Sequence, residues 1–544
     1  MRPEPLLSDT GKGLTVLHRG KNLYSPQEPR EGARRRAAAV GLEDRALVFV
    51  PGLGLGYGLE VLLQRLPPGS RVLCVEADPA LAALASSARA ELPRDGRLKV
   101  LEASSPERAA AAAGELGWHR FRRVQVVVLC GSYYLDRAAY DAMRRRLEEE
   151  LRQFWQNRLT LAHMSGLWLR NLFANLVTLA EGDPPPVLEQ TRPVLVAGAG
   201  PSLEAALPLI RRFRARLTVL CADTALPVLA EAGAAPDWVY ALDAQHYNLE
   251  DFLPYRDPSL CLLCDLSSSP VALRLFPRRL PFATRFHPLA LFERLSAAGL
   301  LPPELPPLGS VGVTAVRAAL ELTAGPVLLA GLDFSYPGGV THARGAPSHR
   351  RDLAACTRLR PAGMRPFEAI AGRPQLRLKG KGGRPVLTDL VLRSYSLQLQ
   401  GFASRGGRVF DLGEEGLETG APRLDPQRLE RLLAGTSPPA LPLRRFHPRA
   451  GEVRRFLLRE VQLLRAAEAE LAKSLGQDRR LATSSAAASP AVAAVEYSLL
   501  CTPEADPERL AERGNLGLGL ANARRLRGSL ERLAEGRLAA GQRS

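Results

Sequence analysis

An apolar run that ends in a glycine-rich turn is the part of this sequence best suited to bind a nucleotide. Residues 194–197 read Val-Leu-Val-Ala, and the next residues include Gly198, Gly200, Pro201 and Ser202. Glycines let a backbone approach a phosphate or ribose, and proline sets φ for the first turn of a helix. The pattern predicts a strand, a ligand-binding turn and a helix that Pro208 breaks or delays. An ordinary strand-to-helix turn is the alternative.

Polar side chains follow the apolar runs that come next. Asp223 and Thr224 follow the run 217–221 after Ala222, and Asp243 follows the run 237–242. Short strands that alternate with helices and end in polar residues favour a parallel sheet whose carboxyl edge holds a ligand. Asp223 lies about 20 residues beyond the glycine turn, where an acid that binds a ribose belongs. A helix N-cap is its alternative role.

The small residues of segment 308–315 predict a second anion-binding point, at the start of a helix that runs to residue 322. Ser310 and Thr314 offer hydroxyl groups to a phosphate, with Val311 between them. A plain cap role for Ser310 is the alternative.

Residues after the apolar run 326–330 are the best candidates for acid–base chemistry. His342 lies in a glycine-rich loop beyond this run, where an imidazole acts as a general base near pH 7. We assign Asp333 to catalysis with it, and Tyr336 and Thr341 to binding of a sugar. Other histidines compete for the role of base: His349, His287 and His246.

Composition describes a globular chain with excess positive charge. At 544 residues it is too long for one core, so two to four domains are expected. The net charge of +17 comes mostly from scattered arginines, which form solvated helix faces or attract an anionic partner such as a nucleotide sugar. No recognition motif accompanies the charge, so we do not expect nucleic acid as a partner.

The seven cysteines mostly lie in apolar runs, as in a reduced intracellular protein. Cys261 and Cys264 have the C-x-x-C spacing without a second pair, which favours a buried strand over a zinc site. The N-terminus lacks the apolar stretch of a secretory signal, and no run approaches the ~20 apolar residues of a membrane span. We therefore expect a cytoplasmic protein without a membrane span.

A second glycine-rich turn lies near the N-terminus. The run 45–50 leads into the glycine-rich stretch 52–58, and a strand over 72–75 ends at Glu76. This is the pattern of dinucleotide or S-adenosylmethionine sites, in which the acid accepts hydrogen bonds from ribose hydroxyls. No methyltransferase-type polar-Pro-Pro-aromatic loop follows the strand expected at 124–129, so the binding function of this domain stays open.

The fold class is therefore α/β, and proline-rich and helical stretches divide the chain into four parts. We expect a Rossmann-like N-terminal domain over 1–150, a helical linker over 151–186, a central α/β nucleotide-binding domain over 187–425, and a C-terminal α-helical domain over 426–544.

The order of these motifs resembles the motility-associated factor (Maf) flagellin glycosyltransferases, over roughly residues 20–425. The stretches that carry the likeness are Gly198–Leu203, Ala222–Ala225, Pro236–Asp237, Leu242–Asp243, Gly309–Val311, Thr314–Ala315, Gly331–Asp333 and Thr341–His342, with Gly52–Gly58 and Tyr24–Pro26 upstream. The central motifs are also similar to bacterial sialyltransferases that use CMP-sialic acid, and to archaeal 6-hydroxymethylpterin diphosphokinases of the MptE type.

This resemblance implies an enzyme that transfers a nonulosonic acid, such as pseudaminic or legionaminic acid, from a CMP-sugar to Ser or Thr of flagellin in the cytoplasm. The central domain would be sialyltransferase-like. No Asp-x-Asp pair follows a strand of this domain, and a CMP-sugar leaves with a single phosphate, so we expect transfer without a metal or other cofactor. The glycine turn would approach the nucleotide, Asp223 and Asp243 would lie near the ribose or sugar, and Ser310 and Thr314 would meet the phosphate. Residues 332–334 resemble the sialyltransferase form more than the commonest Maf pattern, which leaves the acceptor open.

Two alternatives remain. One is an ATP-dependent enzyme like the pterin diphosphokinases, which would need Mg²⁺. The other is a non-catalytic protein that binds flagellin.

Overall fold

The computed structural model describes residues 4–536 except 88–91, 104, 186–191, 254, 256, 406, 435–445, 477–488 and 502–512. The chain forms two compact units. The first comprises the described residues of Met1–His163 and Leu500–Leu518. The second comprises those of Met164–Gly476, Ala488–Leu499 and Gly519–Ser544. The four domain boundaries expected from the sequence stay a prediction.

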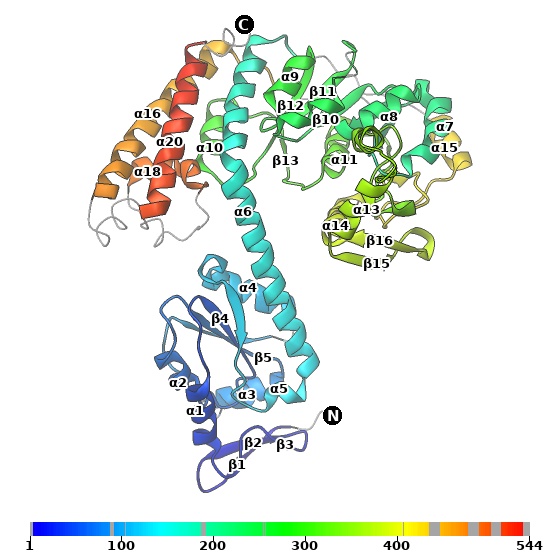
Figure 1. Ribbon diagram of the computed structural model, residues 1–544. Coiled ribbons are helices and arrows are strands. Elements are labelled where there is room, and N and C mark those ends of the chain that lie inside the picture. Colours follow the sequence, from blue (N-terminus) through cyan, green and yellow to red (C-terminus); the bar gives the residue numbers. More distant parts are fainter. Residues whose placement is uncertain are drawn as a thin grey trace. The chain divides into compact units, whose positions relative to one another are not determined.

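The first unit contains a parallel four-stranded sheet in the order β6-β5-β4-β7 (Figure 1). Its strands are β4 (Ala46–Pro51), β5 (Arg71–Glu76), β6 (Leu98–Glu102) and β7 (Arg123–Val126). Its helices include α1 (Pro29–Ala39), α2 (Leu59–Gln64), α3 (Pro79–Ser87), α4 (Pro106–Leu116) and α5 (Ser132–Leu135), and an antiparallel sheet of β1 (Leu6–Asp9), β2 (Leu14–His18) and β3 (Lys21–Asn22) precedes them. Strand, glycine turn, helix and strand thus follow in the predicted order.

One long helix, α6 (Arg137–Glu181), lies between the two glycine-rich turns and includes most of the segment 151–186 that was expected to be helical. Its residues up to His163 belong to the first unit, and those from Met164 belong to the second.

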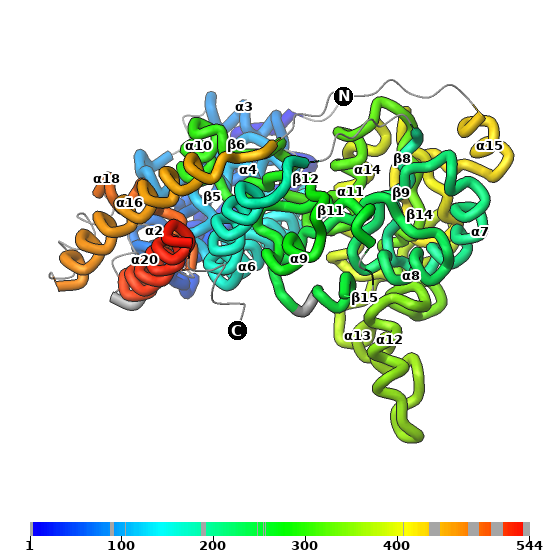
Figure 2. The backbone as a smooth tube through the Cα atoms, turned by 90° about the horizontal axis from the view of Figure 1, so that it is seen from above, coloured from blue at the N-terminus to red at the C-terminus, as the bar shows by residue number. Residues whose placement is uncertain are grey.

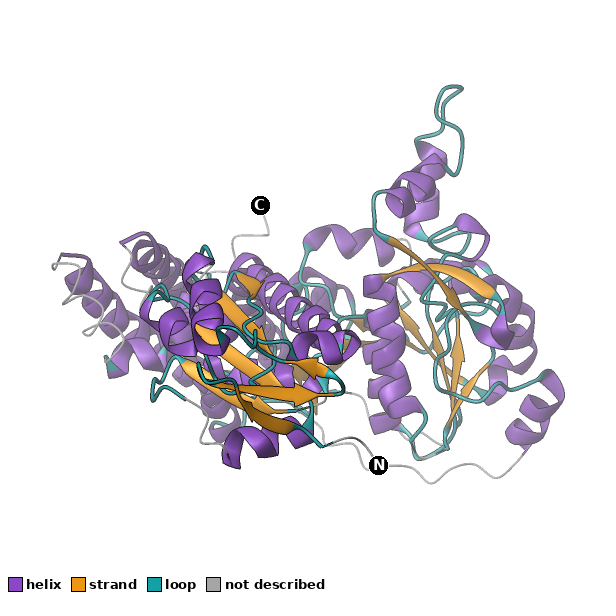
Figure 3. Cartoon of the chain, turned by 90° about the horizontal axis from the view of Figure 1, so that it is seen from below, coloured by secondary structure: helices purple, strands orange, loops and turns teal. Residues whose placement is uncertain are grey.

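The second unit is built on an eight-stranded parallel sheet in the order β13-β12-β11-β10-β9-β8-β14-β17. The strands are β8 (Val194–Ala197), β9 (Thr218–Ala222), β10 (Trp238–Ala241), β11 (Cys261–Asp265), β12 (Arg278–Thr284), β13 (Glu304–Leu305), β14 (Val327–Ala330) and β17 (Val409–Asp411). The central strands are apolar and buried on both faces, as helices on both sides of a parallel sheet require (Figure 3).

Helices pack on this sheet, and the apolar side chains of helices and strands together form the core of the second unit. The helix α11 (Val311–Leu322) buries eight residues, and the strands β8 and β14 contribute to the same apolar cluster. Other helices of the unit are α7 (Leu203–Phe213), α8 (Leu226–Glu231), α9 (Pro270–Leu275), α10 (Ala290–Ala297), α14 (Leu390–Ala403), α15 (Pro426–Ala434), α16 (Ala450–Gly476), α18 (Pro490–Ala494) and the part of α20 (Arg513–Ala534) from Gly519 on. Cys261 and Cys264 are buried in β11, as the sequence predicts.

The helix after the glycine turn differs from expectation. The prediction that Pro208 breaks or delays it was wrong, because α7 begins at Leu203 and continues across Pro208 to Phe213. Leu203, Ala206, Ile210 and Phe213 are buried along one face. We infer that burial of this face outweighs the hydrogen bond that proline cannot donate.

A helical arm interrupts the second unit between β14 and α14. It contains α12 (Pro347–Ala354) and α13 (Met364–Ala371) and projects from the sheet (Figure 2). The hairpin of β15 (Gln375–Lys379) and β16 (Pro385–Asp389) then leads the chain back to α14. Within the described ranges, the chain has no helix that is long and apolar enough to cross a membrane.

Candidate functional site

The sheet of the second unit changes direction between β8 and β14. Successive strands from β8 to β13 are added on one side, and the chain then crosses back to place β14 on the other side of β8. The loops after these two strands therefore diverge, and ligands of open α/β sheets bind at such switch points. The glycine turn after β8 and the turn at Gly331–Ser335 after β14 both lie here.

These two turns are hydrogen-bonded to each other. The Gly200 amide donates to the Gly331 carbonyl at 2.9 Å. The Ser202 amide donates to Asp333 Oδ2 at 2.9 Å, and the Ser202 hydroxyl donates to the other carboxylate oxygen of Asp333. A Cβ on Gly198 would lie 2.6 Å from Leu332 Cδ2, and one on Gly200 would lie 2.6 Å from Asp333 Oδ2. The glycines are thus required by the contact between the turns, and their approach to a nucleotide stays a prediction.

Asp333 holds the glycine turn in place. It is buried, and burial raises the pKa of its carboxyl, while hydrogen bonds from Ser202 and the charge of Lys381 oppose that shift. Lys381 Nζ lies 2.8 Å from Asp411 Oδ2, at the end of β17. Neither Lys381 nor Asp411 was selected from the sequence. The sequence could have pointed to Asp411, because this acid lies at the end of an apolar run, as Asp223 and Asp243 do.

His342 is attached to the glycine turn through its neighbour. The Ala343 amide donates to the Ala199 carbonyl at 2.9 Å. His342 Nδ1 lies 3.1 Å from the hydroxyl oxygens of Thr341 and Ser348. Burial, with smaller contributions from the charges of two arginines, lowers the pKa of His342, so the imidazole is neutral at pH 7.

The geometry of His342 suits a general base. When Nδ1 carries the proton and donates it to a neighbouring hydroxyl, Nε2 presents a free lone pair. Nε2 has no hydrogen-bond partner among the described residues. Thr341, expected to bind a sugar, contacts the His342 imidazole here with its hydroxyl, and its contact with a sugar stays a prediction.

The start of α11 packs against Leu332, which also contacts the glycine turn after β8. A Cβ on Gly312 would lie 2.6 Å from Leu332 Cδ2, the atom that also excludes a side chain at Gly198. Ser310 is the N-cap residue, and its side chain makes no capping hydrogen bond. The Thr314 hydroxyl donates to the Ser310 carbonyl at 2.8 Å and is buried. Ser310, next to Val311, is therefore the more available hydroxyl for an anion.

Asp223 follows β9 and is deeply buried. Its Oδ1 accepts a 2.8 Å hydrogen bond from the Thr224 amide, which is not the N-cap bond expected as its alternative. Its Oδ2 is buried and unpartnered in the described part of the chain. Burial, together with the negative charges of Asp251 and Asp243, raises the pKa of Asp223 to about 8. The carboxyl is therefore largely protonated at pH 7, and its contact with a ribose stays a prediction.

A tyrosine and arginine cluster borders the start of α11. The Tyr336 hydroxyl donates to Asp389 Oδ2 at 2.6 Å, and Arg373 Nη1 donates to the same oxygen at 3.1 Å. A Cβ on Gly309 would lie 2.7 Å from the ring of Tyr395. Burial raises the pKa of Tyr395, with smaller contributions from Asp389 and Asp243. Arg373 is half exposed and carried no local signal in the sequence, because only the fold brings it to Tyr336.

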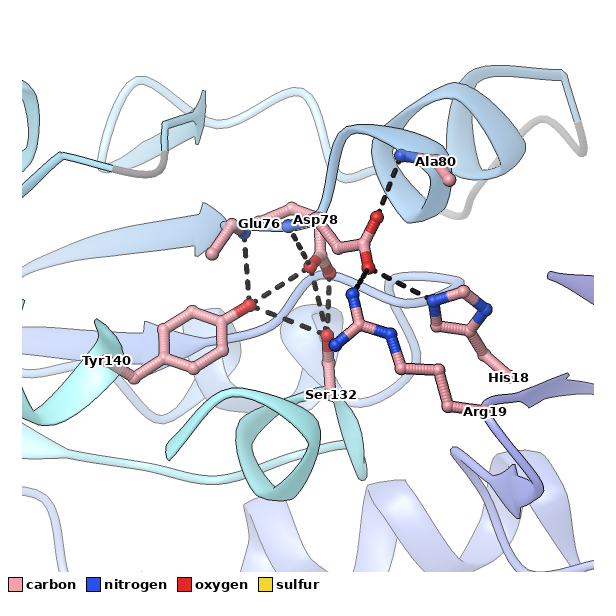
Figure 4. Close-up of polar contacts among 8 residues, drawn as sticks. His18, Arg19, Glu76, Asp78, Ala80, Ser132 and Tyr140 are labelled. Atoms are coloured by element: carbon pink, nitrogen blue, oxygen red, sulfur yellow. Dashed lines mark hydrogen bonds and ion pairs between the residues drawn. The ribbon is translucent and has the colours of Figure 1, made fainter. Parts of the chain in front are cut away.

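The glycine-rich turn of the first unit is filled by protein side chains (Figure 4). Glu76 accepts hydrogen bonds from the Leu53 amide at 2.9 Å and from the hydroxyls of Ser132 and Tyr140 at 3.0 Å each. The Tyr24 hydroxyl occupies the space next to Gly54 and accepts from the Leu55 amide. The carboxylate expected to hold ribose hydroxyls is thus fully used within the unit.

Comparison with known proteins gives a relative that matches most of this chain. An uncharacterised protein of Treponema pallidum (strain Nichols) is 30% identical over 425 residues, which span 76% of this chain and 73% of that protein. The chain belongs to the same family as this Treponema protein. Another uncharacterised protein of that organism is 35% identical over 98 residues, covering 17% of this chain and 46% of its own length.

Two further matches bear on the fold and the central domain. The family model described as 6-hydroxymethylpterin diphosphokinase MptE-like matches residues 170–339. The solved structure of the Maf glycosyltransferase from Magnetospirillum magneticum AMB-1 superimposes with a TM-score of 0.60 and 16% identity, over 98% of this chain and 92% of that one. The predicted resemblance to Maf proteins, with an MptE-like central domain, is confirmed in fold and domain content.

Proposed function

We propose that the second unit is a glycosyltransferase that moves a nonulosonic acid from a CMP-sugar to a Ser or Thr hydroxyl of flagellin. The observation that carries this proposal is the meeting of three segments at the switch point of the sheet. The glycine turn, the start of α11 and the His342 loop are joined there through Leu332 and the hydrogen bond from Ala343 to Ala199. The shared fold with a Maf glycosyltransferase supports it.

In this proposal His342 is the general base. Its Nε2 takes the proton from the acceptor hydroxyl, the freed oxygen attacks the anomeric carbon, and a new carbon–oxygen bond forms. The bond between the anomeric carbon and the phosphate oxygen breaks, and CMP leaves with the electron pair. A single displacement of this kind inverts the configuration at the anomeric carbon. In this proposal Ser310, the N-cap of α11, and the first amides of that helix support the negative charge that develops on the departing phosphate.

A second candidate is transfer of diphosphate from ATP to a pterin, and the name of the matched family model favours it. It predicts stabilisation by ATP with Mg²⁺. A protein that only binds flagellin predicts stabilisation by no nucleotide.

Thermal denaturation with CMP, ATP plus Mg²⁺, or S-adenosylmethionine separates these functions. A ligand at 100 times its Kd stabilises the folded state by about 2.7 kcal/mol, which is several degrees in Tm. We expect this shift with CMP alone. A shift with ATP and Mg²⁺ in place of CMP would support the diphosphokinase. Release of CMP from CMP-N-acetylneuraminate, followed by mass spectrometry of flagellin, then tests donor and acceptor.

A further inference from the structure

The arm formed by Pro347–Ala371 exposes large apolar side chains. Leu359 is 89% exposed, Phe367 is 64% exposed and Leu353 is 51% exposed. Single exposed apolar residues are common on protein surfaces. Three of them within one short element that projects from the sheet (Figure 2) are a different case, because they are gathered in a small part of the chain.

Hydrogen bonds within the arm fix the position of these side chains. Leu359 lies in a tight turn in which Thr357 and Arg360 exchange backbone hydrogen bonds of 2.9 and 3.1 Å. The Gly363 amide donates to the buried carboxylate of Asp352 at 2.7 Å, which ties this turn to α12. Arg360 pairs with Glu368 at 2.5 Å, which ties it to α13. The exposed leucine is thus presented on a rigid turn, as a binding anchor is.

The arm also carries positive charge that the chain does not neutralise. It contains five arginines against two acidic residues. Arg350 and Arg351 at its base pair with Glu231 and Glu250, and Arg360 pairs with Glu368. The exposed Arg358 and Arg365 have no acidic partner among the described residues. Arg358 is adjacent to Leu359 in the sequence, and Arg365 and Phe367 both belong to α13, so the same short element carries charge and apolar area.

Both ends of the arm begin at the candidate site. α12 starts five residues after His342, and Arg373 follows the last residue of α13 by two. Arg350 and Arg351 also anchor the base of the arm to the second unit beside the acidic residues near Asp223. A polypeptide held on the arm therefore has neighbouring residues within reach of the switch point.

We propose that this arm is the docking element for the protein acceptor, and that it binds an acidic segment of the acceptor with apolar residues on one face. This inference rests on the proposed function. Aromatic and arginine side chains are the residues that contribute most at protein interfaces. A second copy of the chain is a poorer partner, because its net charge of +17 repels a basic arm. An anionic membrane is the other class of surface that basic and apolar residues bind.

The test measures binding of purified flagellin from the source organism by biolayer interferometry. The double variant L359S/F367S removes the apolar anchors, and R358E/R365E reverses the unpaired charge. The matched control L253S/L458S changes two leucines of similar type that are 46% and 45% exposed outside the arm. We expect both arm variants to bind flagellin at least tenfold more weakly and the control to bind within twofold of wild type, with circular dichroism unchanged in all.

The proposal is overturned if wild type does not bind flagellin, or if the arm variants bind it within twofold of wild type. It is also overturned if the arm variants keep flagellin binding but lose either binding to phosphatidylglycerol vesicles or self-association. Release of CMP from CMP-N-acetylneuraminate without acceptor is measured in parallel. Because that reaction does not need the arm, we expect it unchanged in the arm variants. The absence in wild type of both this CMP release and a Tm shift with CMP would remove the proposed donor chemistry while leaving the flagellin binding result to stand separately.

Discussion

The side chain on which most depends is His342, and its replacement gives the sharpest test of the site. His342→Ala removes the proton acceptor that we assign to the transferring hydroxyl. General bases contribute roughly 10²- to 10⁴-fold to rate, so we expect kcat for transfer to fall by at least about 10². CMP should raise Tm as in wild type, because the imidazole contacts the acceptor and not the nucleotide. Steady-state assays with flagellin as acceptor measure the loss.

The pH profile checks the same assignment. Burial lowers the pKa of His342, so the base stays neutral down to a pH below the ordinary histidine value of about 6.5. On the acidic side of pH 7, the rate should therefore hold until the pH is below about 6.5 and fall only in more acidic buffer. His349→Ala serves as the control, since His349 Nδ1 accepts a hydrogen bond from the Gly345 amide. Equal losses in both variants would argue against His342 as the base.

Asp223 gives a prediction about stability. Its pKa of about 8 in the folded state lies above the value of about 4 in an unfolded chain. Between these values the unfolded chain releases the proton and the folded chain keeps it, so wild-type stability falls as pH rises. Asp223→Asn has no such proton. Its free energy of unfolding, from urea titrations, should match wild type near pH 4 and exceed it increasingly up to pH 8.

The control for this titration has the opposite sign. Hydrogen bonds from Ser259 lower the pKa of Asp257, so its contribution is present at neutral pH and is lost in acid. Asp257→Asn should therefore be less stable than wild type at neutral pH, with the difference fading in acid. A gap between Asp223→Asn and wild type that did not grow with pH would show that Asp223 is ionised when folded.

Residues that follow strands were predictable, and residues that meet only through the fold were not. Asp223 and His342 were selected because they follow apolar runs, and Ser310 because small residues precede a helix; their roles stay predictions. Lys381 and Arg373 come from an insertion, and their partners Asp411 and Asp389 lie 30 and 16 residues further on. No local pattern in the sequence predicts contacts between residues so far apart.

At the scale of elements, the interlocked turns after β8 and β14 predict an unequal response of two glycines. Gly331 has φ +66°, and a Cβ there would collide with the Gly198 carbonyl and lie 2.9 Å from Leu203 Cβ. Gly339 has φ +73° with open space around it. Gly339→Ala should cost about 1–2 kcal/mol from backbone strain alone. Gly331→Ala should cost clearly more by urea denaturation, and equal costs would mean that the turns separate easily.

The filled turn of the first unit gives another prediction. Tyr140→Phe removes a hydrogen bond to Glu76 and leaves the Ala77 amide without its 3.1 Å acceptor. Loss of a buried partner costs about 1–3 kcal/mol, measured as a lower Tm. Tyr134→Phe is the control, because Tyr134 is 62% exposed. S-adenosylmethionine should leave Tm unchanged in wild type, since Ser132 and Tyr140 use the carboxylate that would hold its ribose.

The failure at Pro208 shows how elements depart from local rules. Proline disfavours a helix interior by about 3 kcal/mol. A face with four buried apolar residues recovers more than that amount. The presence of Pro208 was therefore a poorer guide to α7 than the spacing of the apolar residues along the helix, which indicates a helix that starts at Leu203.

For the whole molecule, the two compact units predict two calorimetric transitions, of which only one responds to nucleotide. Each unit has its own sheet and its own apolar clusters, so we expect them to unfold separately. Tyr140→Phe identifies the transition of the first unit, and Gly331→Ala identifies that of the second. A ligand that binds one folded unit raises only that unit's Tm. CMP should therefore move the transition that Gly331→Ala lowers, and movement of the other would place the nucleotide in the N-terminal unit despite its filled turn.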